Sequence, residues 1–374
     1  MINKKIKVLH ATVSSTMGGR TRYIFGLWES IDKSRFQFDF ATFSKSVDYK
    51  ITDGENCFKM HYLPCYPSED QERFAKEWNR ILDEDYDIVH LHTGFWNGYQ
   101  MEELTAKRGS TKIIIHSHNT GIGKYMNEHD ALNAVNEHYR MRESIDLSMA
   151  DDFWACSYAA KKWLFGERIT DQNAFVTYPT IDEKRFTFNE EVREKSRDCL
   201  CAQDSYIIGT VGRLVPQKNQ LFLLRLMPGL LKLNSKICLM IVGGGQLKDE
   251  LEKEAEELGI SDSIIWTGEC KDPREYYQAM DLFVLPSLYE GFPKVVLEAL
   301  AVGLTCICAD TITEEIEIDE NVMRISLEYD EWENAIARCM NDKNDRRCRL
   351  DARFSSLNEI GRIEERYLGL VLGN

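Results

Sequence analysis

The sequence lacks any long hydrophobic run: no window of its 374 residues approaches the roughly 18 uninterrupted apolar residues of a membrane-spanning helix. We therefore expect no helix that crosses a bilayer. The first residues, MINKKIKVLHATV, are basic and then apolar like a signal peptide, but the apolar part is short and no small-residue cleavage site follows it. We interpret this segment as a first β-strand.

Paired cysteines and an excess of basic residues are also missing. The 11 cysteines are odd in number, scattered and without a C-x-x-C pair, so they indicate neither a disulfide framework nor a structural zinc site and favour the reducing cytosol. Acidic residues outnumber basic ones by 61 to 46, and the net charge of −15 would repel a phosphate backbone. We expect no nucleic acid partner, although a local basic patch could attract an anionic lipid surface.

The dinucleotide fingerprint G-x-G-x-x-G is absent after the first predicted strand, which argues against a dehydrogenase. In IVGGGQL, Gly243 to Gly245 follow a later predicted strand, but Lys248 occupies the place of the third glycine. These glycines fit a nucleotide close to the backbone, and equally a plain turn. Gly18 and Gly19 lie between the first strand and a helix, where their amides could cradle a phosphate or a sugar.

The length of the chain predicts two domains rather than one core. Short apolar runs alternate with helical patterns in both halves, as in YDIVHLH and KIIIHSH and then SYIIGTVGRL and KICLMIVGGG, which predicts α/β domains with doubly wound parallel sheets. The charged segment TYPTIDEKRFTFNEEVREKSRDC separates them. We place the domains at 1–178 and 183–357, with a closing helix at 358–374, and expect a cleft faced by the carboxyl ends of both sets of strands.

The clearest phosphate-binding pattern is GTVGRLVPQKNQ. Gly209 and Gly212 would let the backbone approach a ligand at a strand end. Arg213 and Lys218 flank the start of the next helix, where unpaired N–H groups already favour anions. Two cations and a helix terminus suit a diphosphate, whereas the alternative is an ordinary Arg and Lys on a surface loop.

The stretch SLYEGFPKVVLEALAVG contains two carboxylates, Glu290 and Glu298. Pro293 suits the first position of a helix, which we expect to run to about Val302 and to end at Gly303. No other charge follows Lys294 in this helix, so we expect Glu298 to lie in a partly dry place. A carboxylate in such a place needs a hydrogen-bond partner.

Four of the eight histidines, His90, His92, His116 and His118, end two predicted strands. The alternation in HLH and HSH points both members of each pair to the same face of a sheet. Imidazoles gathered in this way could ligate zinc, but no carboxylate or thiolate lies beside them at ligand spacing. We expect two or three of the four to be neutral rings bonded to backbone carbonyls, with one available to a ligand.

Three further patterns have simpler interpretations. Asp83 and Asp85 match the D-x-D pattern of some metal-dependent nucleotide-sugar enzymes, but they lie at a helix end before a strand, where a solvated face is expected. The segment Lys161–Phe165, KKWLF, could touch a membrane, although packing of its aromatic residues inside the first domain is the favoured interpretation. Cys306 and Cys308 are expected to be small core residues.

Several motifs together resemble glycosyltransferase family 4 enzymes of the GT-B fold, and especially bacterial exopolysaccharide and capsule glycosyltransferases. The resemblance rests on VGRLVPQKN, PSLYEGFPKVVLEALAVGL and DTITEE in that order, and extends to YDIVHLHTG, HSHNTG and ACSYAAKKWLFG. It implies two Rossmann-like domains, the last helix crossing back to the first of them. It also implies a retaining hexosyltransferase that needs no metal and no cofactor besides a nucleotide-sugar, by resemblance a UDP-sugar.

The resemblance assigns roles to individual residues. Glu298 would accept hydrogen bonds from the ribose, Glu290 would hold the transferred sugar, and Arg213 with Lys218 would hold the diphosphate. His118 would reach the sugar from the first domain. The implied catalytic residues are Arg213, Lys218, Glu290 and His118, and the implied donor-binding residues are Gly18, Gly19, Gly212, Gly243, Gly291, Phe292, Pro293 and Glu298. The implied acceptor is a glycan or a lipid-linked saccharide, and the implied location is the cytoplasm, where the cytoplasmic face of the membrane is one place of action.

The chain also departs from the family pattern. Thr21 stands where the family's Gly-Gly-x-Glu loop has its glutamate, Gly244 replaces an aspartate, and Pro179 to Asp182 replace Asn-Gly-Ile-Asp. The first departure bears on acceptor preference. Two other functions stay open at this point: a nucleotide-sugar epimerase or hydrolase on the same scaffold, and a donor-binding subunit that only activates a partner.

Overall fold

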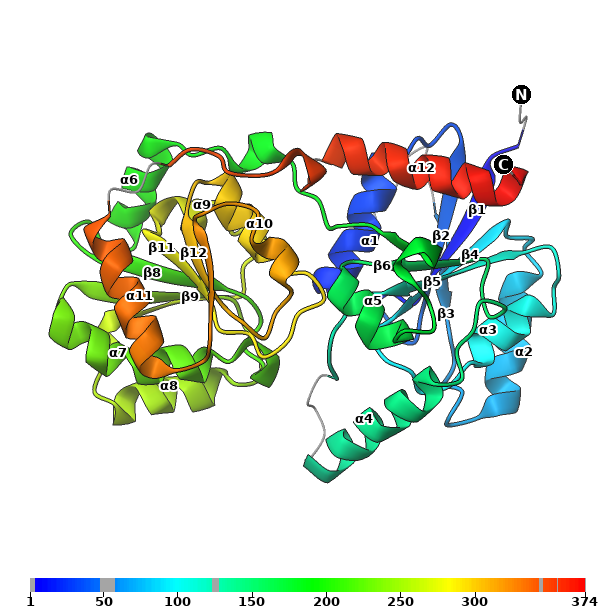
Figure 1. The fold of residues 1–374 in the computed structure, drawn as a ribbon, viewed down its shortest axis with the longest axis horizontal. Helices are drawn as coiled ribbons and strands as arrows, with labels where there is room; N and C mark the ends of the chain where they lie inside the picture. The colour runs from blue at the N-terminus through cyan, green and yellow to red at the C-terminus, as the bar shows by residue number, and fades with distance from the viewer. Residues whose placement is uncertain (1–3, 48–57, 123–127, 343–345, 355, 374) are drawn as a thin grey trace. The chain divides into compact units, whose positions relative to one another are not determined.

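The computed structural model describes residues 4–47, 58–122, 128–342, 346–354 and 356–373. The chain divides into two compact units (Figure 1). Unit 1 takes Met1–Ile122, Met126–Pro179 and Ser356–Asn374, and unit 2 is built on Thr180–Ser355. Each unit is a parallel sheet with helices between most of its successive strands, so the predicted α/β class with two doubly wound domains is confirmed.

Unit 1 contains seven parallel strands in the order β3-β2-β1-β4-β5-β6-β7. The strands are β1 (Ile6–Ala11), β2 (Phe36–Thr42), β3 (Met60–Tyr62), β4 (Ile88–Thr93), β5 (Lys112–Ser117), β6 (Asp152–Ala155) and β7 (Ala174–Val176). The helices are α1 (Gly19–Ser30), α2 (Gln71–Leu82), α3 (Gln100–Ala106), α4 (Glu128–Arg142), α5 (Tyr158–Phe165) and α12 (Ser356–Leu372). The central strands are buried along almost their whole length, as expected for a sheet covered on both faces.

Unit 2 contains six parallel strands in the order β10-β9-β8-β11-β12-β13. The strands are β8 (Tyr206–Val211), β9 (Ile237–Val242), β10 (Ile264–Gly268), β11 (Leu282–Leu285), β12 (Thr305–Ala309) and β13 (Val322–Ile325). The helices are α6 (Glu190–Cys199), α7 (Gln220–Leu233), α8 (Lys248–Glu257), α9 (Arg274–Ala279), α10 (Lys294–Ala301) and α11 (Tyr329–Asn341). The helix predicted to begin at Pro293 is α10, with Pro293 as its N-cap.

Short 3₁₀ turns complete the secondary structure. They are η1 (Asp171–Asn173), η2 (Glu183–Phe186), η3 (Pro216–Lys218), η4 (Ser261–Ser263), η5 (Glu314–Ile316) and η6 (Ala352–Phe354). Of these, η3 matters for the candidate site because it joins β8 to α7.

The last helix, α12, packs on unit 1, where Figure 1 shows it in red beside α1. Tyr367 is fully buried and stacks on Trp154, and Arg366 donates two hydrogen bonds of 2.6 and 2.7 Å to the carboxylate of Asp152 on β6. The amphipathic pattern of the C-terminal segment therefore corresponds to a helix whose apolar face completes the core of the first unit.

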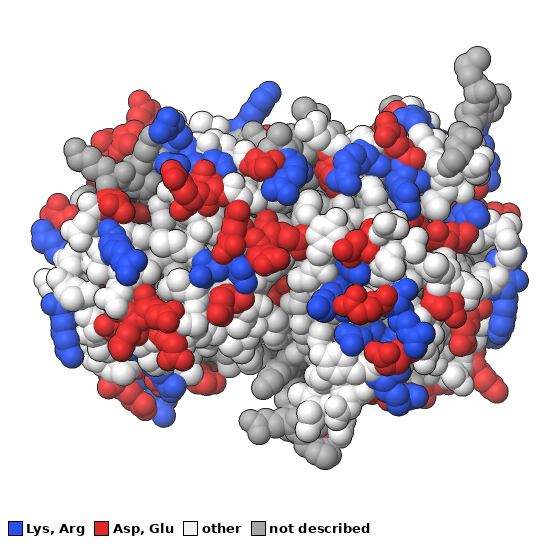
Figure 2. Space-filling view, in the orientation of Figure 1, with Lys and Arg blue, Asp and Glu red and all other residues white. Residues whose placement is uncertain are grey.

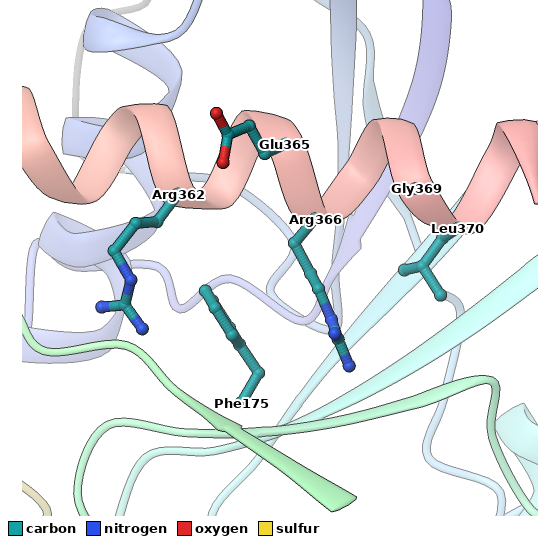
Figure 3. Close-up of a pocket in the computed structure, with 6 residues that line it drawn as sticks. All are labelled: Phe175, Arg362, Glu365, Arg366, Gly369 and Leu370. Atoms are coloured by element: carbon teal, nitrogen blue, oxygen red, sulfur yellow. The ribbon is translucent and has the colours of Figure 1, made fainter. Parts of the chain in front are cut away.

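A surface pocket of about 450 Å³ lies against α12 (Figure 3). Arg362 and Arg366 extend to the same side of the helix with the Phe175 ring between them, while Glu365 points to the opposite side. Both arginines already have acidic partners, because Arg362 pairs with Glu359 and Arg366 with Asp152. The pocket therefore offers no uncompensated positive charge to an anion.

The surface carries charges of both signs. Figure 2 shows acidic and basic side chains interspersed over the visible face of the described residues, without a broad basic area. This distribution agrees with the net charge of −15. Among the described residues, no helix combines the length and the hydropathy that crossing a membrane requires.

Strand order fixes where ligands can reach each unit. The order reverses between β1 and β4 in unit 1 and between β8 and β11 in unit 2. At such a point the loops after two neighbouring strands diverge to opposite faces and leave a crevice at the carboxyl edge of the sheet. The residues that follow β1, β4, β8 and β11 are therefore the first to be considered as a site.

Candidate functional site

The loop after β8 carries the residues predicted to bind phosphate. Arg213 is exposed on it, and Lys218 ends the turn η3. The lysine side chain lies over Gly212, where an added Cβ would be 3.2 Å from the lysine Cε. Gly212 thus leaves room for the lysine stem. Gly209 was predicted to lie at the ligand, which is wrong: it lies within β8, where a Cβ would collide with the side chain of Met280.

Asn219 turns the chain from η3 into α7 with a φ of 53°. Its side-chain amide donates to the carbonyl of Pro286 at 3.2 Å, and Gln220 donates to the carbonyl of Arg213 at 3.0 Å. These bonds hold the start of α7 against the loops that follow β8 and β11. A helix N-terminus, which favours anions, therefore lies directly after Lys218.

Glu290, from the loop after β11, meets Lys218 directly. Its Oε1 lies 2.5 Å from the lysine Nζ, and the residue is only 8% exposed. Gln217 donates to the carbonyl of Tyr289 at 2.8 Å and lies 3.4 Å from the second oxygen of Glu290. The resemblance assigned Lys218 to the diphosphate and Glu290 to the sugar, and the structure places the two side chains in one partly buried ion pair.

Glu298 lies in a largely dry place on α10, as the apolar sequence around it predicted, with 7% of its surface exposed. The hydroxyl of Tyr277 on α9 donates to its Oε2 at 2.9 Å. The sequence gave no signal for this partner, because the two residues are 21 positions apart and on different helices. An ionised carboxylate can accept about four hydrogen bonds, so the tyrosine leaves capacity for other donors.

The turn between Glu290 and α10 is compact. Gly291, Phe292 and Pro293 are all buried, and the Phe292 ring packs against Phe354 with the ring centroids 5.4 Å apart. This packing fixes the direction in which α10 begins, and with it the position of Glu298 one to two turns later.

The glycines after β9 serve the packing of two loops. A Cβ at Gly243 would lie 2.0 Å from the carbonyl oxygen of Gly212, and one at Gly245 would lie 2.5 Å from that of Leu214. Both glycines also have positive φ values, 143° and 159°. The structural reason for these glycines is therefore the close approach of the β9 loop to the loop that carries Arg213.

The glycines of unit 1 lie differently. Gly18 is the N-cap of α1 and Gly19 its first residue, and a Cβ on either would have nothing within 4 Å. Thr21, which replaces the family's glutamate, is buried and accepts a hydrogen bond from the Ser14 amide at 3.1 Å. The threonine therefore holds its own loop in place.

Five histidines gather at the centre of unit 1, on β1, β4 and at the end of β5. His10, His92 and His118 form one row: His10 Nδ1 lies 2.9 Å from His92 Nε2, and His92 Nδ1 lies 2.8 Å from His118 Nε2. We expected two or three of the four histidines in HLH and HSH to bond to backbone carbonyls. That prediction was wrong: within the described part of the chain their ring nitrogens contact other imidazoles and, for His90, the hydroxyl of Tyr367.

A second row begins at α12. The hydroxyl of Tyr367 lies 2.7 Å from His90 Nδ1, and His90 Nε2 lies 3.1 Å from His116 Nδ1. His10 was not singled out from the sequence, where it is one polar residue in an apolar strand. Parallel register with β4 places it directly beside His90.

Metal ions could in principle be held by three groups of described residues. Two are histidine triplets, His10 with His90 and His92, and His92 with His116 and His118; the third is Asp39 with His61 and Glu84. The separations of 2.8 to 3.1 Å within the rows are hydrogen-bond distances. Two nitrogens on one tetrahedral zinc would be about 3.3 Å apart, given bonds of about 2.0–2.1 Å. The geometry favours N–H···N bonds.

Burial keeps these rings neutral. It lowers the pKa of His10 to about 3, and it lowers the pKa values of His90, His92 and His116 well below the usual value. The pKa of His118 is also well below the usual value, because of burial and then of the neighbouring His116 and the Arg20 cation. These imidazoles therefore act as hydrogen-bonding groups rather than as cations near neutral pH.

Asp83 and Asp85 lie away from the carboxyl edges of the two sheets. Asp83 caps the C-terminal end of α2, and its carboxylate pairs with Arg108 at 2.8 Å, at the amino end of β4 rather than its carboxyl end. Asp85 has a φ of 55° in the turn that follows. The expected solvated position of the D-x-D pair agrees with this arrangement.

The segment Lys161–Phe165 forms most of α5. Leu164 and Phe165 are fully buried, Trp163 donates to the carbonyl of Gly94 at 2.7 Å, and Lys161 pairs with Asp171. The favoured prediction, packing inside the first domain, is confirmed for this segment. Cys306 and Cys308 are buried in β12 as predicted.

Comparison with known proteins adds to this geometry. Residues 192–353 match the family described as Glycosyl transferases group 1. The chain is 30% identical over 349 residues to a protein named putative glycosyltransferase EpsF from Bacillus subtilis (strain 168), covering 90% of this chain and 88% of the relative.

A second relative is the UDP-Gal:alpha-D-GlcNAc-diphosphoundecaprenol alpha-1,3-galactosyltransferase of Escherichia coli, 23% identical over 99% of this chain and 98% of its own length. Among solved structures, Anabaena HepE in complex with UDP superposes with a TM-score of 0.73 at 19% identity, covering 97% of this chain and 99% of HepE. At that identity the structural likeness establishes the fold alone.

The glycine positions generate a stability prediction. We expect Gly243→Ala to destabilise the protein by roughly 1–3 kcal/mol, because its backbone combines a positive φ with a close carbonyl. Gly19→Ala is the matched control, since Gly19 is the first residue of α1, its φ lies outside the positive range and the space around it is open. Thermal unfolding of the two variants would check this, and equal melting temperatures would contradict it.

The buried histidines generate a pH prediction. In the folded state their pKa values lie below 6.5, so the unfolded chain binds more protons as pH falls below 6.5, and folding stability falls with it. Each ring that stays neutral costs roughly 1.4 kcal/mol per pH unit below that value. We expect the urea midpoint to drop clearly from pH 7.5 to pH 5.5, and less steeply in His90→Gln. A flat midpoint over this interval would show that the rings accept protons in the fold.

Proposed function

The chain belongs to the glycosyl transferases group 1 family, and on this premise we propose that it moves a hexose-type sugar from a UDP-sugar to a hydroxyl of a growing, lipid-linked cell-surface polysaccharide, with retention of anomeric configuration. Its two Rossmann-like units are the domains of the GT-B fold. The name of the E. coli relative includes both a UDP-sugar and a sugar on diphosphoundecaprenol, which supports this choice of donor and acceptor.

The observation that carries the proposal is the meeting of Lys218 and Glu290 at the point where strand order reverses in unit 2. The lysine and the start of α7 suit the diphosphate, with Arg213 on the same loop. Glu290 offers carboxylate oxygens beside them, at the place where a sugar attached to that diphosphate would follow. The carboxyl edge of this sheet thus holds complementary groups for both parts of a nucleotide-sugar.

The nucleoside end is assigned to Glu298. Ribose hydroxyls donate hydrogen bonds, and a mostly buried carboxylate that Tyr277 already orients is a suitable acceptor for them. No side chain among the described residues identifies the base. The choice of uracil rests on the UDP-Gal relative, and the fold shared with UDP-bound HepE is compatible with it.

The reaction breaks the bond between the anomeric carbon and the oxygen of the β-phosphate, and forms a bond from the acceptor oxygen to the same carbon. Positive charge develops on the sugar and negative charge on the departing phosphate. Arg213 and Lys218 stabilise the departing phosphate, which makes a metal unnecessary in this proposal. In same-face attack the acceptor proton passes to a phosphate oxygen, so no protein base is required.

Peripheral contact with the cytoplasmic face of the membrane belongs to the same proposal, because a lipid-linked acceptor is held there. Lys161–Phe165 cannot supply that contact, as its apolar side chains are largely buried. The helix α4 suits the contact better: Leu132 and Tyr139 are exposed and seven residues apart, which places them on one face.

We expect calorimetry to show tighter binding of UDP than of GDP or ADP. Turnover of a UDP-sugar should require an acceptor and should survive EDTA, since the cations on the phosphates are Arg213 and Lys218.

Tighter binding of GDP would overturn the choice of nucleotide. Turnover without an acceptor would favour the hydrolase or epimerase, loss of activity on chelation would require a metal, and binding without turnover would favour an activating subunit.

The carboxylate and the cation should separate kinetically. Glu298→Gln weakens an interaction that is equal in ground and transition states, so we expect KM for the donor to rise while much of kcat remains. Arg213 meets a charge that grows as the bond breaks, so Arg213→Ala should lower kcat by about tenfold to a few hundredfold. Steady-state kinetics over a range of donor concentrations up to saturation checks both, with Tyr277→Phe expected to follow Glu298→Gln. The reverse pattern would show that the two roles are exchanged.

A further inference from the structure

The row His10, His92, His118 leads from the core of unit 1 to a half-buried ring. His10 is fully buried between strands and packs against Phe38, with the ring centroids 4.3 Å apart. His92 is 4% exposed, and His118, just beyond β5, is half-buried. Each imidazole contacts the next through one nitrogen, so the three rings form a chain with two internal contacts and two outer nitrogens.

Counting protons limits the states of this chain. Three neutral imidazoles carry three N–H protons, and each internal contact needs one proton between its two nitrogens, because two facing lone pairs repel each other. Two protons fill the two contacts. The third must lie on an outer nitrogen, either His10 Nε2 or His118 Nδ1, and the choice sets the tautomer of all three rings together.

The two outer nitrogens are not equivalent. His10 Nε2 is buried and has no hydrogen-bond partner within the described part of the chain. His118 Nδ1, in contrast, is not a buried nitrogen that lacks a partner. A buried N–H without an acceptor is rarer and more costly than a buried lone pair without a donor. The third proton therefore belongs on His118 Nδ1. His10 then donates to His92, and His92 donates to His118.

We propose that His92, held by His10, is a positioning residue that fixes His118 as the Nδ1–H tautomer, so that His118 presents a hydrogen-bond donor to the ligand. Lowered pKa values agree with a neutral ring, and the charged or titratable groups packed nearest to His118 are Arg20, Tyr23, His92 and His116. His118 then selects for an oxygen acceptor and cannot act as a base through Nδ1.

The consequence for catalysis rests on the proposed function, but the tautomer does not. If a sugar binds at His118, its contact atom must be an oxygen that accepts, such as a hydroxyl or a carboxylate oxygen. A deoxy sugar lacking that oxygen would leave a donor unpaired, which is penalised more than the loss of a neutral contact.

The tautomer can be observed directly by long-range ¹H–¹⁵N correlation on the ¹⁵N-histidine-labelled protein at pH 7.5. His138 supplies an internal reference with the opposite tautomer. The Trp96 amide donates to its Nδ1 at 3.0 Å, and its Nε2 lies 3.0 Å from the Trp163 carbonyl, so its proton lies on Nε2. We expect a protonated Nδ1 and an unprotonated Nε2 for His118, and the reverse for His138. A His118 protonated on Nε2, or on both nitrogens, would overturn the proposal.

Two substitutions at one position separate hydrogen bonding from packing. His92→Gln can accept from His10 and donate to His118, while His92→Phe keeps an aromatic ring without a nitrogen. We expect His92→Gln to keep the single His118 tautomer and most of kcat, and His92→Phe to give mixed tautomers and a loss in kcat of about tenfold. If His92→Phe is instead the milder change, the role is packing and the proposal fails.

Two controls complete the test. His90→Phe lies in the second row of the same core, so it should leave the His118 tautomer unchanged while imposing a comparable change in packing.

Titrating the wild-type protein with zinc and then with EDTA examines metal ligation, and altered His118 signals would overturn the proposal. Should His92→Phe not fold, the wild-type spectrum alone still decides the tautomer. Inactivity towards UDP-sugars, by contrast, would reject the proposed function and leave the tautomer assignment standing.

Discussion

The reversal of strand order within each parallel sheet is the constraint on which the candidate site depends. Where the connections after two adjacent strands run along the same face of the sheet, the carboxyl ends of those strands are covered. Where the two connections leave by opposite faces, the carboxyl ends of both strands are open to a ligand. In unit 2 these neighbours are β8 and β11, and their loops bring Lys218 and Glu290 into contact across 72 positions of sequence. In unit 1 the neighbours are β1 and β4, which place the loop of Gly18 and Gly19 at the same edge as the histidines.

Polar groups at these edges first pair with one another. Glu290 is neutralised by Lys218, Glu298 is oriented by Tyr277, and the histidines bond in rows. Each pair meets the requirement that a polar group removed from water must keep a partner. The same contacts fix side chains in one geometry before any ligand arrives, so little ordering remains to be done on binding. The contacts that shape the candidate site are therefore the same contacts that satisfy its buried polar groups in the folded protein.

Local patterns in the sequence predicted the local features well. Pro293 and Gly303 marked the ends of α10, the apolar run around Glu298 predicted its burial, and HLH and HSH placed two pairs of histidines on one face. The hydrogen-bond partners of these side chains could not be predicted from local patterns. Tyr277, and the contact of His10 with His92, depend on helices and strands distant in sequence, and no periodicity encodes which of them become neighbours. Gly209 was misassigned because a glycine before a loop and a glycine packed under Met280 look alike in sequence.

The pairing of Lys218 with Glu290 has a consequence for a nucleotide-sugar, given the proposed function. A diphosphate that takes the lysine as its partner removes the cation from Glu290, whose carboxylate remains largely buried and must find other donors. The hydroxyls of the attached sugar can supply them, but a nucleotide without a sugar cannot. This exchange of partners therefore weakens the binding of the bare nucleotide relative to the binding of the intact nucleotide-sugar. The same exchange leaves Glu290 ionised and facing the sugar, where negative charge stabilises the positive charge that develops as the anomeric bond breaks.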